Sequence, residues 1–318
     1  MHPLFSVMGV DPVAVLGAGG PTGVECVREL LAEGHRCRAV VRDPSKYQGN
    51  GTFPEHKNLT IVKGDVTDRA SLEPALRGCK SAIFAASVAG YWGAWKVDCE
   101  VGRTLGIAGI HTAVETCAHC QGVANAASVA KEVGVEQMAL VSSRLVEQHN
   151  WLVPLRFILN TVKWGLMDAK LEGERRLRRV AAGSCTPVLW IHAGRGFATR
   201  RSPCRESGLP YTIVRPGGLK NNGGGSELVV GQGDKEMADP RAGRTISRND
   251  VARCGQSPWC PPEFDIATTL SQCSRRVCIA ALSDKNARGK TFEVVATKEP
   301  SKAPSNHYAS LFQRLALD

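Results

Sequence analysis

Three glycines, spaced three residues apart, separate an apolar segment from a helical one near the N-terminus. They are Gly17, Gly20 and Gly23, in the sequence VLGAGGPTG that begins at Val15. Glycine permits a tight turn and lets the backbone approach a pyrophosphate, while the helix that follows offers unpaired N–H groups and the positive end of its dipole. Pro21 suits the first turn because it has no N–H to leave unpaired. The pattern predicts a nucleotide phosphate site at the start of a βαβ unit.

Side chains after the next two strands would contact the adenosine half of such a nucleotide. The second strand ends in VVRD, where Arg42 offers a cation for the 2′-phosphate of NADP and Asp43 a carboxylate for the ribose hydroxyls of NAD. We favour NADP over NAD; a surface pair between Arg42 and Asp43 is the structural alternative. Asp65, in GDVTD, could accept a hydrogen bond from the adenine amino group or cap the following helix.

The chain contains twelve cysteines, and two of them form a CxxC motif, Cys117 and Cys120, with His111 and His119 nearby. A secreted domain with so many cysteines would be disulfide-bonded, but a nucleotide-binding pattern of this kind indicates reduced thiols. No second CxxC follows at zinc spacing. We therefore predict no metal site and do not interpret the motif as a redox centre.

Short apolar segments alternate with helical ones along the chain. The expected strands are Val13–Leu16, Arg36–Val41, Leu59–Val62, Ser81–Ala86, Gln137–Ser143, Tyr211–Gly218 and Thr291–Ala296. This alternation predicts an α/β fold, a single Rossmann-like domain with a doubly wound parallel sheet of about seven strands. The domain would span 13–318 after an N-terminal extension, 1–12. Leu219–Gly243 is expected to form a mobile glycine-rich flap, followed by a helix capped by Ser247 or Asn249.

Composition excludes two classes of partner. The formal net charge is +10, but the basic residues are scattered rather than clustered with aromatics, so we predict no nucleic-acid binding. No apolar run approaches the length of about 18 residues that a membrane span needs. The first residues, MHPLFSVMGVDP, have no clear signal or transit character.

Several motifs together resemble the atypical short-chain dehydrogenase/reductases of the NmrA-like, NAD(P)-binding type. These are VLGAGGPTG, VVRD, GDVTD, LVSS, AKLEGERRLR, SGLPYTIVRPGGL and TISRNDVA. The likeness is greatest to plastid-associated members of plants and algae, so it implies a chloroplast location, with the cytoplasm as the alternative. The resemblance implies a dinucleotide-binding set of Gly17, Gly20, Pro21, Thr22, Gly23, Arg42, Asp65, Val66, Ala85, Ala86, Ser87, Lys170, Pro216 and Gly217.

The catalytic signature that the resemblance implies is incomplete. Active members use a serine and a tyrosine–lysine pair four residues apart, in which the lysine lowers the pKa of the tyrosine. Ser142 and Ser143 match the serine and Lys170 matches the lysine, but Leu166 stands where the tyrosine belongs. An acceptor that takes its proton from water would not need the tyrosine. Lys170 would bind the cofactor ribose, or else be an ordinary surface residue of its helix.

Three segments interrupt the family pattern: 100–120, 179–205 and 254–276. Each falls within an expected helix, where insertions break the hydrogen-bond ladder, and together they hold seven of the twelve cysteines. We interpret them as translated non-coding sequence, which sequencing of the cDNA would test. The alternative is a set of real insertions that form a cysteine-rich cap.

Two functions follow as expectations. The first is an NADPH-dependent oxidoreductase that acts on a quinone, a flavin or a similar small-molecule acceptor. The second is a non-catalytic NADP(H) sensor or assembly scaffold with a protein partner. A transcriptional regulator of nitrogen metabolism, which the family name suggests, is a weaker third.

Overall fold

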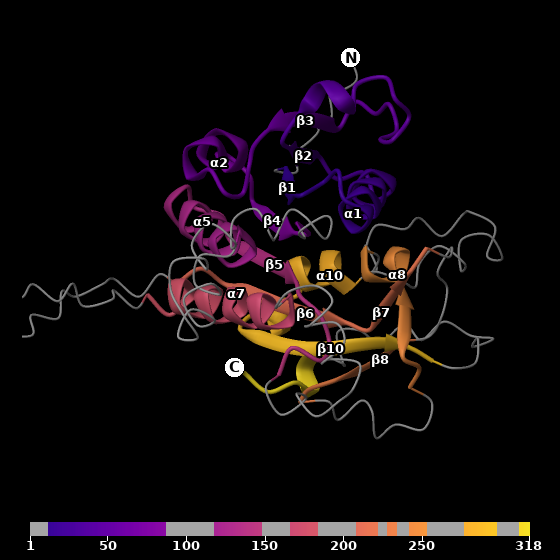
Figure 1. The fold of residues 1–318 in the computed structure, drawn as a ribbon, viewed down its shortest axis with the longest axis vertical. Coiled ribbons are helices and arrows are strands. Elements are labelled where there is room, and N and C mark those ends of the chain that lie inside the picture. The colour runs from indigo at the N-terminus through magenta and orange to yellow at the C-terminus, as the bar shows by residue number, and fades with distance from the viewer. Residues whose placement is uncertain are drawn as a thin grey trace, which may run out of the picture.

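The computed structural model describes residues 12–86, 118–147, 166–183, 208–221, 228–233, 242–252, 277–297 and 312–318. Its centre is an eight-stranded sheet in the order β3-β2-β1-β4-β5-β6-β10-β8 (Figure 1). These strands are β1 Val13–Leu16, β2 Cys37–Val41, β3 Leu59–Lys63, β4 Ser81–Phe84, β5 Gln137–Val141, β6 Tyr211–Pro216, β8 Leu228–Gly231 and β10 Lys290–Ala296. Two further strands, β7 Gly218–Lys220 and β9 Thr245–Ser247, pair with each other.

Seven strands of the large sheet run parallel, and they are the seven that the sequence predicts. The order 3-2-1-4-5-6 is that of a doubly wound Rossmann sheet. The eighth strand, β8, is antiparallel to β10, with Val229 opposite Val295. It lies within Leu219–Gly243, so the expectation of a flap is wrong for β8, whose backbone is hydrogen-bonded into the sheet. Parts of that segment, 222–227 and 234–241, lie outside the described residues.

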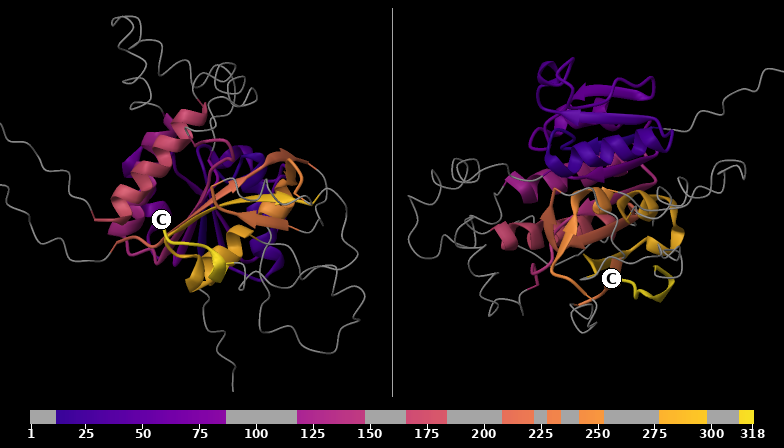
Figure 2. Two further views of the ribbon diagram at one scale, coloured as in Figure 1. Left: turned by 90° about the horizontal axis from the view of Figure 1, so that it is seen from below. Right: turned by 90° about the vertical axis from the view of Figure 1, so that its right-hand side faces the viewer.

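Helices cover both faces of the sheet. They are α1 Pro21–Ala32, α2 Arg69–Leu76, α5 Ala118–Glu132, α7 Leu166–Ala181, α8 Arg248–Ala252 and α10 Val277–Ser283, with short 3-10 turns η1 Pro44–Lys46 and η4 Lys285–Ala287. Successive side chains of a strand point to opposite faces. Helices α1, α8 and α10 lie on one face of the sheet and α2, α5 and α7 on the other (Figures 1 and 2). Val13 and Val15 of β1 therefore pack in the core cluster with α1, α8 and α10, whereas Ala14 and Leu16 pack in the cluster with α2, α5 and α7.

Capping residues account for several helix ends. Helix α1 stops before Gly34, whose φ of +77° suits the left-handed conformation after a helix C-terminus. The side chain of Asp68 accepts a hydrogen bond from the N–H of Ala70 at the start of α2. For α8, Ser247 accepts from the N–H of Asn249, so Ser247 is the capping residue of the two that the sequence offers.

The three segments that interrupt the family pattern lie mostly outside the described residues, as do residues 1–11. Where they are described, they continue regular elements: Ala118–Cys120 forms the first turn of α5 and Arg179–Ala181 the last turn of α7. Cys120 is fully buried against Ala169. Within the part of the chain that the structure describes, no helix combines the length and apolar character that crossing a bilayer requires.

Candidate functional site

Two of the three glycines of the motif, Gly17 in the turn after β1 and Gly23 in α1, have no room for a side chain. Gly17 has a φ of +77°, and a Cβ atom there would lie 2.5 Å from Cα of Ala86. A Cβ atom on Gly23 would lie 2.2 Å from the carbonyl oxygen of Gly17. Gly20 differs, since its nearest contact would be 3.4 Å away, so this residue borders open space. The turn is tight on its protein side and open on the other, as a cradle for a phosphate must be.

Helix α1 begins at this turn without a side-chain cap. Gly20 is the N-cap residue, Pro21 occupies the first helical position, and no side-chain hydrogen bond caps this end. The N–H of Gly20 donates to the carbonyl of Gly17 at 3.0 Å. The N–H groups of Thr22 and Gly23 come too early in the helix to have an intrahelical acceptor. These amides and the helix dipole fit a dinucleotide pyrophosphate.

The cradle lies where the strand order reverses, because β1 is flanked by β2 on one side and β4 on the other. Ligands of open α/β sheets bind at this point, beyond the carboxyl ends of the strands. After β4, the N–H of Ala85 donates to the carbonyl of Leu16 at 3.0 Å, and Ala86 touches the Gly17 turn. Ala85 and Ala86 thus border the cradle, as expected, whereas Ser87 lies outside the described residues.

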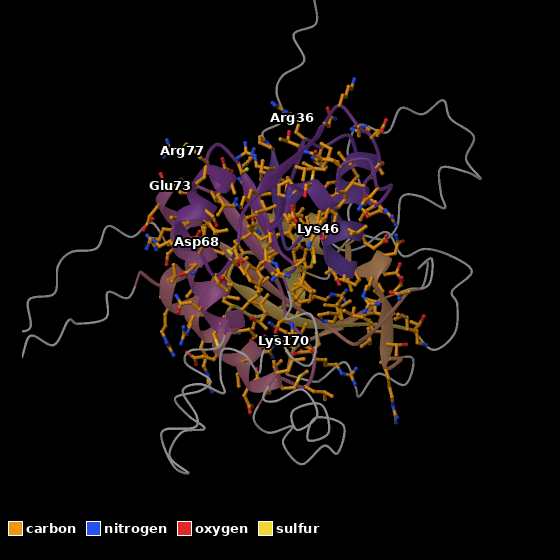
Figure 3. All side chains as sticks on the ribbon, turned by 45° about the horizontal axis from the view of Figure 1, so that its top comes forward. Arg36, Lys46, Asp68, Glu73, Arg77 and Lys170 are labelled. Atoms are coloured by element: carbon orange, nitrogen blue, oxygen red, sulfur yellow. The ribbon has the colours of Figure 1, made fainter. Side chains whose placement is uncertain are left out.

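At the end of β2, the two residues that bear on cofactor choice have different surroundings. Arg42 is exposed and has no hydrogen bond or ion pair within the described residues. The alternative of a surface pair with Asp43 is therefore wrong. Asp43 instead accepts from the N–H and hydroxyl of Ser45, at 3.2 and 2.6 Å, and lies 3.7 Å from Nζ of Lys46 (Figure 3). The Ser45 hydrogen bond lowers the pKa of Asp43, although burial acts in the opposite direction.

Asp65 closes a turn rather than capping the next helix. Its Oδ1 accepts from both the N–H and the hydroxyl of Thr67, at 2.9 and 2.8 Å. The helix cap is Asp68, so that alternative for Asp65 is wrong. Val66 lies against Gly122 of α5, where an added Cβ atom would come within 2.8 Å of it. Val66 therefore fills space between β3 and α5.

Ser142 and Lys170 meet at the carboxyl end of β5. Lys170, labelled in Figure 3, lies on α7. It is 8% exposed, and its Nζ donates to the carbonyl of Ser142 at 3.4 Å. It is therefore not a surface residue. The hydroxyl of Ser142, which is 4% exposed, has no hydrogen-bond partner among the described residues. Ser143 turns its hydroxyl to the carbonyl of Arg144 at 3.0 Å. A buried hydroxyl without a partner is rare, and an acceptor atom on a ligand would supply one.

An apolar side chain occupies the position of the missing tyrosine. Leu166 begins α7 and packs against Val146, Met167 and Leu171. This cluster adjoins a strained turn, because Leu145 has a φ of +69°, which non-glycine residues rarely adopt. The structure thus places apolar contact surface, and no proton donor, at this position.

Pro216 and Gly217 complete the edge of the sheet beside β5. The N–H of Arg144 donates to the carbonyl of Pro216, and the N–H of Gly217 to that of Val294, both at 2.9 Å. A Cβ atom on Gly217 would lie 2.8 Å from the carbonyl oxygen of Arg244. These two residues therefore share the carboxyl edge with Ser142 and with the cradle.

A buried ionic network, which the sequence motifs did not indicate, connects β6, α7 and β10 near this edge of the sheet. Arg215 of β6 is 3% exposed and bonds Glu174 of α7, Glu293 of β10 and Glu147 in the turn after β5. A signal was available: an arginine inside the apolar strand YTIVRP requires a buried partner. Glu174 follows Lys170 by four residues, so both lie on the same face of α7.

The cysteine motif lies mostly outside the described residues. Cys120 is buried in an apolar contact, while Cys117 and His111 lie outside the described residues. Within the described part of the chain, no three His, Cys, Asp or Glu side chains are grouped so as to hold a metal ion.

Comparisons with known proteins agree with this geometry. The family described as NAD(P)H-binding matches residues 17–183 and 198–255. An uncharacterized chloroplastic protein of Arabidopsis thaliana is 28% identical over 310 residues, covering 94% of this chain and 81% of its own. Sanguinarine reductase of Eschscholzia californica is 23% identical over 312 residues, 95% of each chain. Among solved structures, an anaerobillin reductase of Escherichia coli O157:H7 has the same fold, with a TM-score of 0.53 and 17% sequence identity. The match covers 91% of this chain and 100% of the reductase chain.

Proposed function

The chain belongs to the NAD(P)H-binding family, and from this premise we propose that it is an NADPH-dependent reductase of a quinone, a flavin or a similar conjugated acceptor. The observation that carries the proposal is the buried Ser142 hydroxyl, which has no partner among the described residues and lies beside Lys170. The reductase names of two similar proteins support the same reaction class.

The dinucleotide would be held by groups at the carboxyl edge of the sheet. Its pyrophosphate would accept hydrogen bonds from the amides at the start of α1, next to Gly20. Arg42 has no partner in the described residues and would pair with a 2′-phosphate, which favours NADP over NAD. Asp43 is already bonded to Ser45 and is less available to ribose hydroxyls.

At the reacting end, bound NADPH would supply a hydride. The Ser142 hydroxyl would donate a hydrogen bond to the acceptor oxygen and stabilise the negative charge that forms there. Lys170, held against the carbonyl of Ser142, would add positive charge on the same side. Because Leu166 cannot donate a proton, the proton that follows the hydride would come from water. This restricts the reaction to acceptors whose reduced form is a stabilised anion.

Steady-state oxidation of NADPH with a panel of quinones and flavins tests the proposal. We expect turnover with at least one acceptor, and a loss of about a hundredfold or more in kcat for Ser142→Ala, the size typical of one lost oxyanion contact. Ser143→Ala is the matched control, because that hydroxyl is bonded to the backbone of Arg144. Equal losses in both variants would contradict the assignment.

Binding is tested separately from turnover. A carboxylate introduced by Gly20→Glu would occupy the open side of the cradle and repel the pyrophosphate, so we expect NADPH affinity to be lost while the fold persists. Retention of wild-type affinity by this variant would remove the basis of the proposal.

Leu166 supports a second candidate, a non-catalytic NADP(H)-binding sensor or scaffold with a protein partner. This function needs the cradle and Lys170 but no proton donor. Micromolar NADPH binding with no oxidation in the presence of any acceptor would favour it over the reductase.

We also propose a chloroplast location, on the basis of the chloroplastic Arabidopsis thaliana relative. Expression of the full-length protein as a fluorescent fusion in a plant cell would test it. A cytoplasmic signal would contradict it.

A further inference from the structure

The phenol of Tyr47 lies on the glycine turn of the cradle. A Cβ atom on Gly19 would fall 2.0 Å from its hydroxyl oxygen and 2.5 Å from Cζ, so the ring tip touches the Gly19 backbone. Tyr47 follows the 3-10 turn η1, and its N–H donates to the carbonyl of Pro44 at 3.0 Å. This turn directs the chain from the end of β2 back over the start of α1. The side chain of Tyr47 thereby connects the segment after β2, where the adenosine ribose would bind, with the glycine turn, where the diphosphate would bind.

The ring of Tyr47 is held in place, while its hydroxyl is not engaged. Its centroid lies 5.4 Å from that of Phe53, which is buried in the core. Within the described residues the hydroxyl has no hydrogen-bond partner. Aromatic packing thus fixes a phenol whose O–H is available to a ligand at the cradle, and fixing a donor in advance lowers the entropy cost of binding.

The charges nearby favour an anion as the ligand of this hydroxyl. Arg42 lies two residues before η1 and has no ion pair within the described residues, whereas Lys46 ends η1 and lies 3.7 Å from Asp43. Gly19 leaves its own side of the turn clear for the phenol. The carboxylate of Asp43, just before η1, is already bonded to Ser45.

We propose that Tyr47 determines specificity for NADP(H) by donating its phenolic hydrogen bond to the 2′-phosphate of the adenosine ribose. This inference rests on the proposed function, because it requires the dinucleotide to lie in the cradle. Tyr47 acts together with Arg42, one as an oriented donor and the other as a cation. Hydrogen bonds to charged groups are stronger than those to neutral ones, so removal of the hydroxyl affects NADPH far more than NADH.

The test uses Tyr47→Phe, which keeps the ring and its contact with Phe53. Calorimetric titrations of the full chain with NADPH, NADH, 2′,5′-ADP and 5′-AMP measure binding without any acceptor. We expect the variant to bind NADPH and 2′,5′-ADP about tenfold more weakly. Binding of NADH and 5′-AMP is expected to change by less than about twofold, since a lost neutral hydrogen bond costs little.

Tyr211→Phe is the matched control, because Tyr211 is the first residue of β6 and so lies at the amino ends of the parallel strands, away from the cradle at their carboxyl ends. Its hydroxyl donates to Asp318. A second variant, Gly19→Ala, keeps Tyr47 but forces its phenol off the turn, and we expect it to reduce NADPH affinity more than NADH affinity. Thermal unfolding of Tyr47→Phe and of Gly19→Ala is compared with that of the wild type.

The outcomes separate this inference from the function beneath it. If the wild-type chain binds neither NADPH nor NADH, the proposed function fails first. If the wild type binds NADPH and Tyr47→Phe keeps the same preference for it, the assignment of Tyr47 alone is overturned. Equal losses for both dinucleotides would also overturn it, since they would indicate a structural support for the turn.

Discussion

Arg215 of β6 holds Glu174 of α7 through two hydrogen bonds, from Nε to Oε1 at 3.0 Å and from Nη2 to Oε2 at 2.6 Å. Both side chains are almost completely buried. The pair fixes α7 against β6, one helical turn from Lys170. The geometry at the Ser142 edge therefore depends on an ion pair that takes no part in the chemistry.

Replacement of Arg215 by methionine is expected to destabilise the fold by about 3–5 kcal/mol, because the buried carboxylates of Glu174 and Glu293 would lose the guanidinium that they both contact. Burial by itself lowers the pKa of Arg215, but the hydrogen bonds and charge of Glu174, with the charge of Glu147, raise it more, so the guanidinium stays charged. Urea denaturation measures the loss. Arg69→Met is the control, because the pair of Arg69 with Glu132 is half-exposed and should contribute no more than about 1 kcal/mol. Similar losses in the two variants would contradict the prediction.

Gly23→Ala is expected to lower the free energy of unfolding by about 1–3 kcal/mol, since the new Cβ atom would meet backbone atoms that cannot move aside. Gly20→Ala is the comparison, because its Cβ atom has room; the change of N-cap residue should cost less than about 1 kcal/mol. Chemical denaturation of both variants gives the difference. A larger loss of unfolding free energy in Gly20→Ala than in Gly23→Ala would contradict the packing described for these two glycines.

Tyr211 is expected to ionise at a higher pH than an unperturbed tyrosine. Burial, the charge of Asp318 and the hydrogen bond to it raise its pKa from 10.0 to about 12. Because the raised value belongs to the folded state, the associated stabilisation is complete below pH 10.0 and is lost as the pH rises from 10.0 to about 12. Absorbance titration of phenolate measures this. Asp318→Ala should move the ionisation of Tyr211 to lower pH, and an unchanged titration in Tyr211→Phe would refute the assignment.

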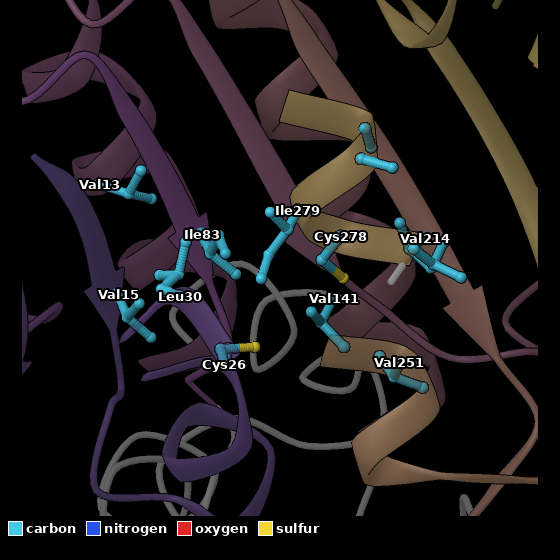
Figure 4. Close-up of a cluster of buried hydrophobic side chains, with 14 of the residues drawn as sticks. Val13, Val15, Cys26, Leu30, Ile83, Val141, Val214, Val251, Cys278 and Ile279 are labelled. Carbon is cyan, nitrogen blue, oxygen red and sulfur yellow. The ribbon is translucent and has the colours of Figure 1, made fainter. Parts of the chain in front are cut away.

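Three core thiols are expected to resist alkylation in the native protein. Burial raises the pKa of Cys37 and of Cys278 to about 12 and that of Cys26 well above 9.0. Figure 4 shows Cys26 and Cys278 among the apolar side chains between α1 and α10. Iodoacetamide at pH 8 should modify these thiols in urea and leave them unmodified in buffer, as measured by peptide mass spectrometry. Rapid native labelling at any of them would mean that the core opens.

The same thiols give a stability prediction with a definite sign. Their folded-state pKa values exceed the ordinary 9.0, so the protonated form is favoured in the folded protein. The stabilisation is complete below pH 9.0 and declines as the pH rises towards about 12. Cys278→Ala should make the unfolding free energy less dependent on pH in this range. An unaltered dependence would count against burial of this thiol.

The sequence by itself determined the features that depend on neighbouring residues. The left-handed φ of Gly17, the start of α1 at Pro21 and the seven parallel strands follow from local steric rules and from apolar periodicity. Right-handed crossovers also led to the prediction of a doubly wound sheet, whereas the order of its strands is known from the structure. The sequence motifs indicated Ser142 and Lys170 as candidate site residues, but they did not indicate the contact between the two.

Tertiary structure alone decided the features that join residues distant in the chain. Arg215 and Glu174 are separated by 41 residues, and β8 pairs with β10 across a long connection, so no local pattern specified either partnership. The position of Tyr47 on Gly19 is of the same kind, since it depends on how η1 folds back over α1. Such contacts form because burying a charge or a ring requires a complementary partner, and packing of the whole chain determines which residue provides it.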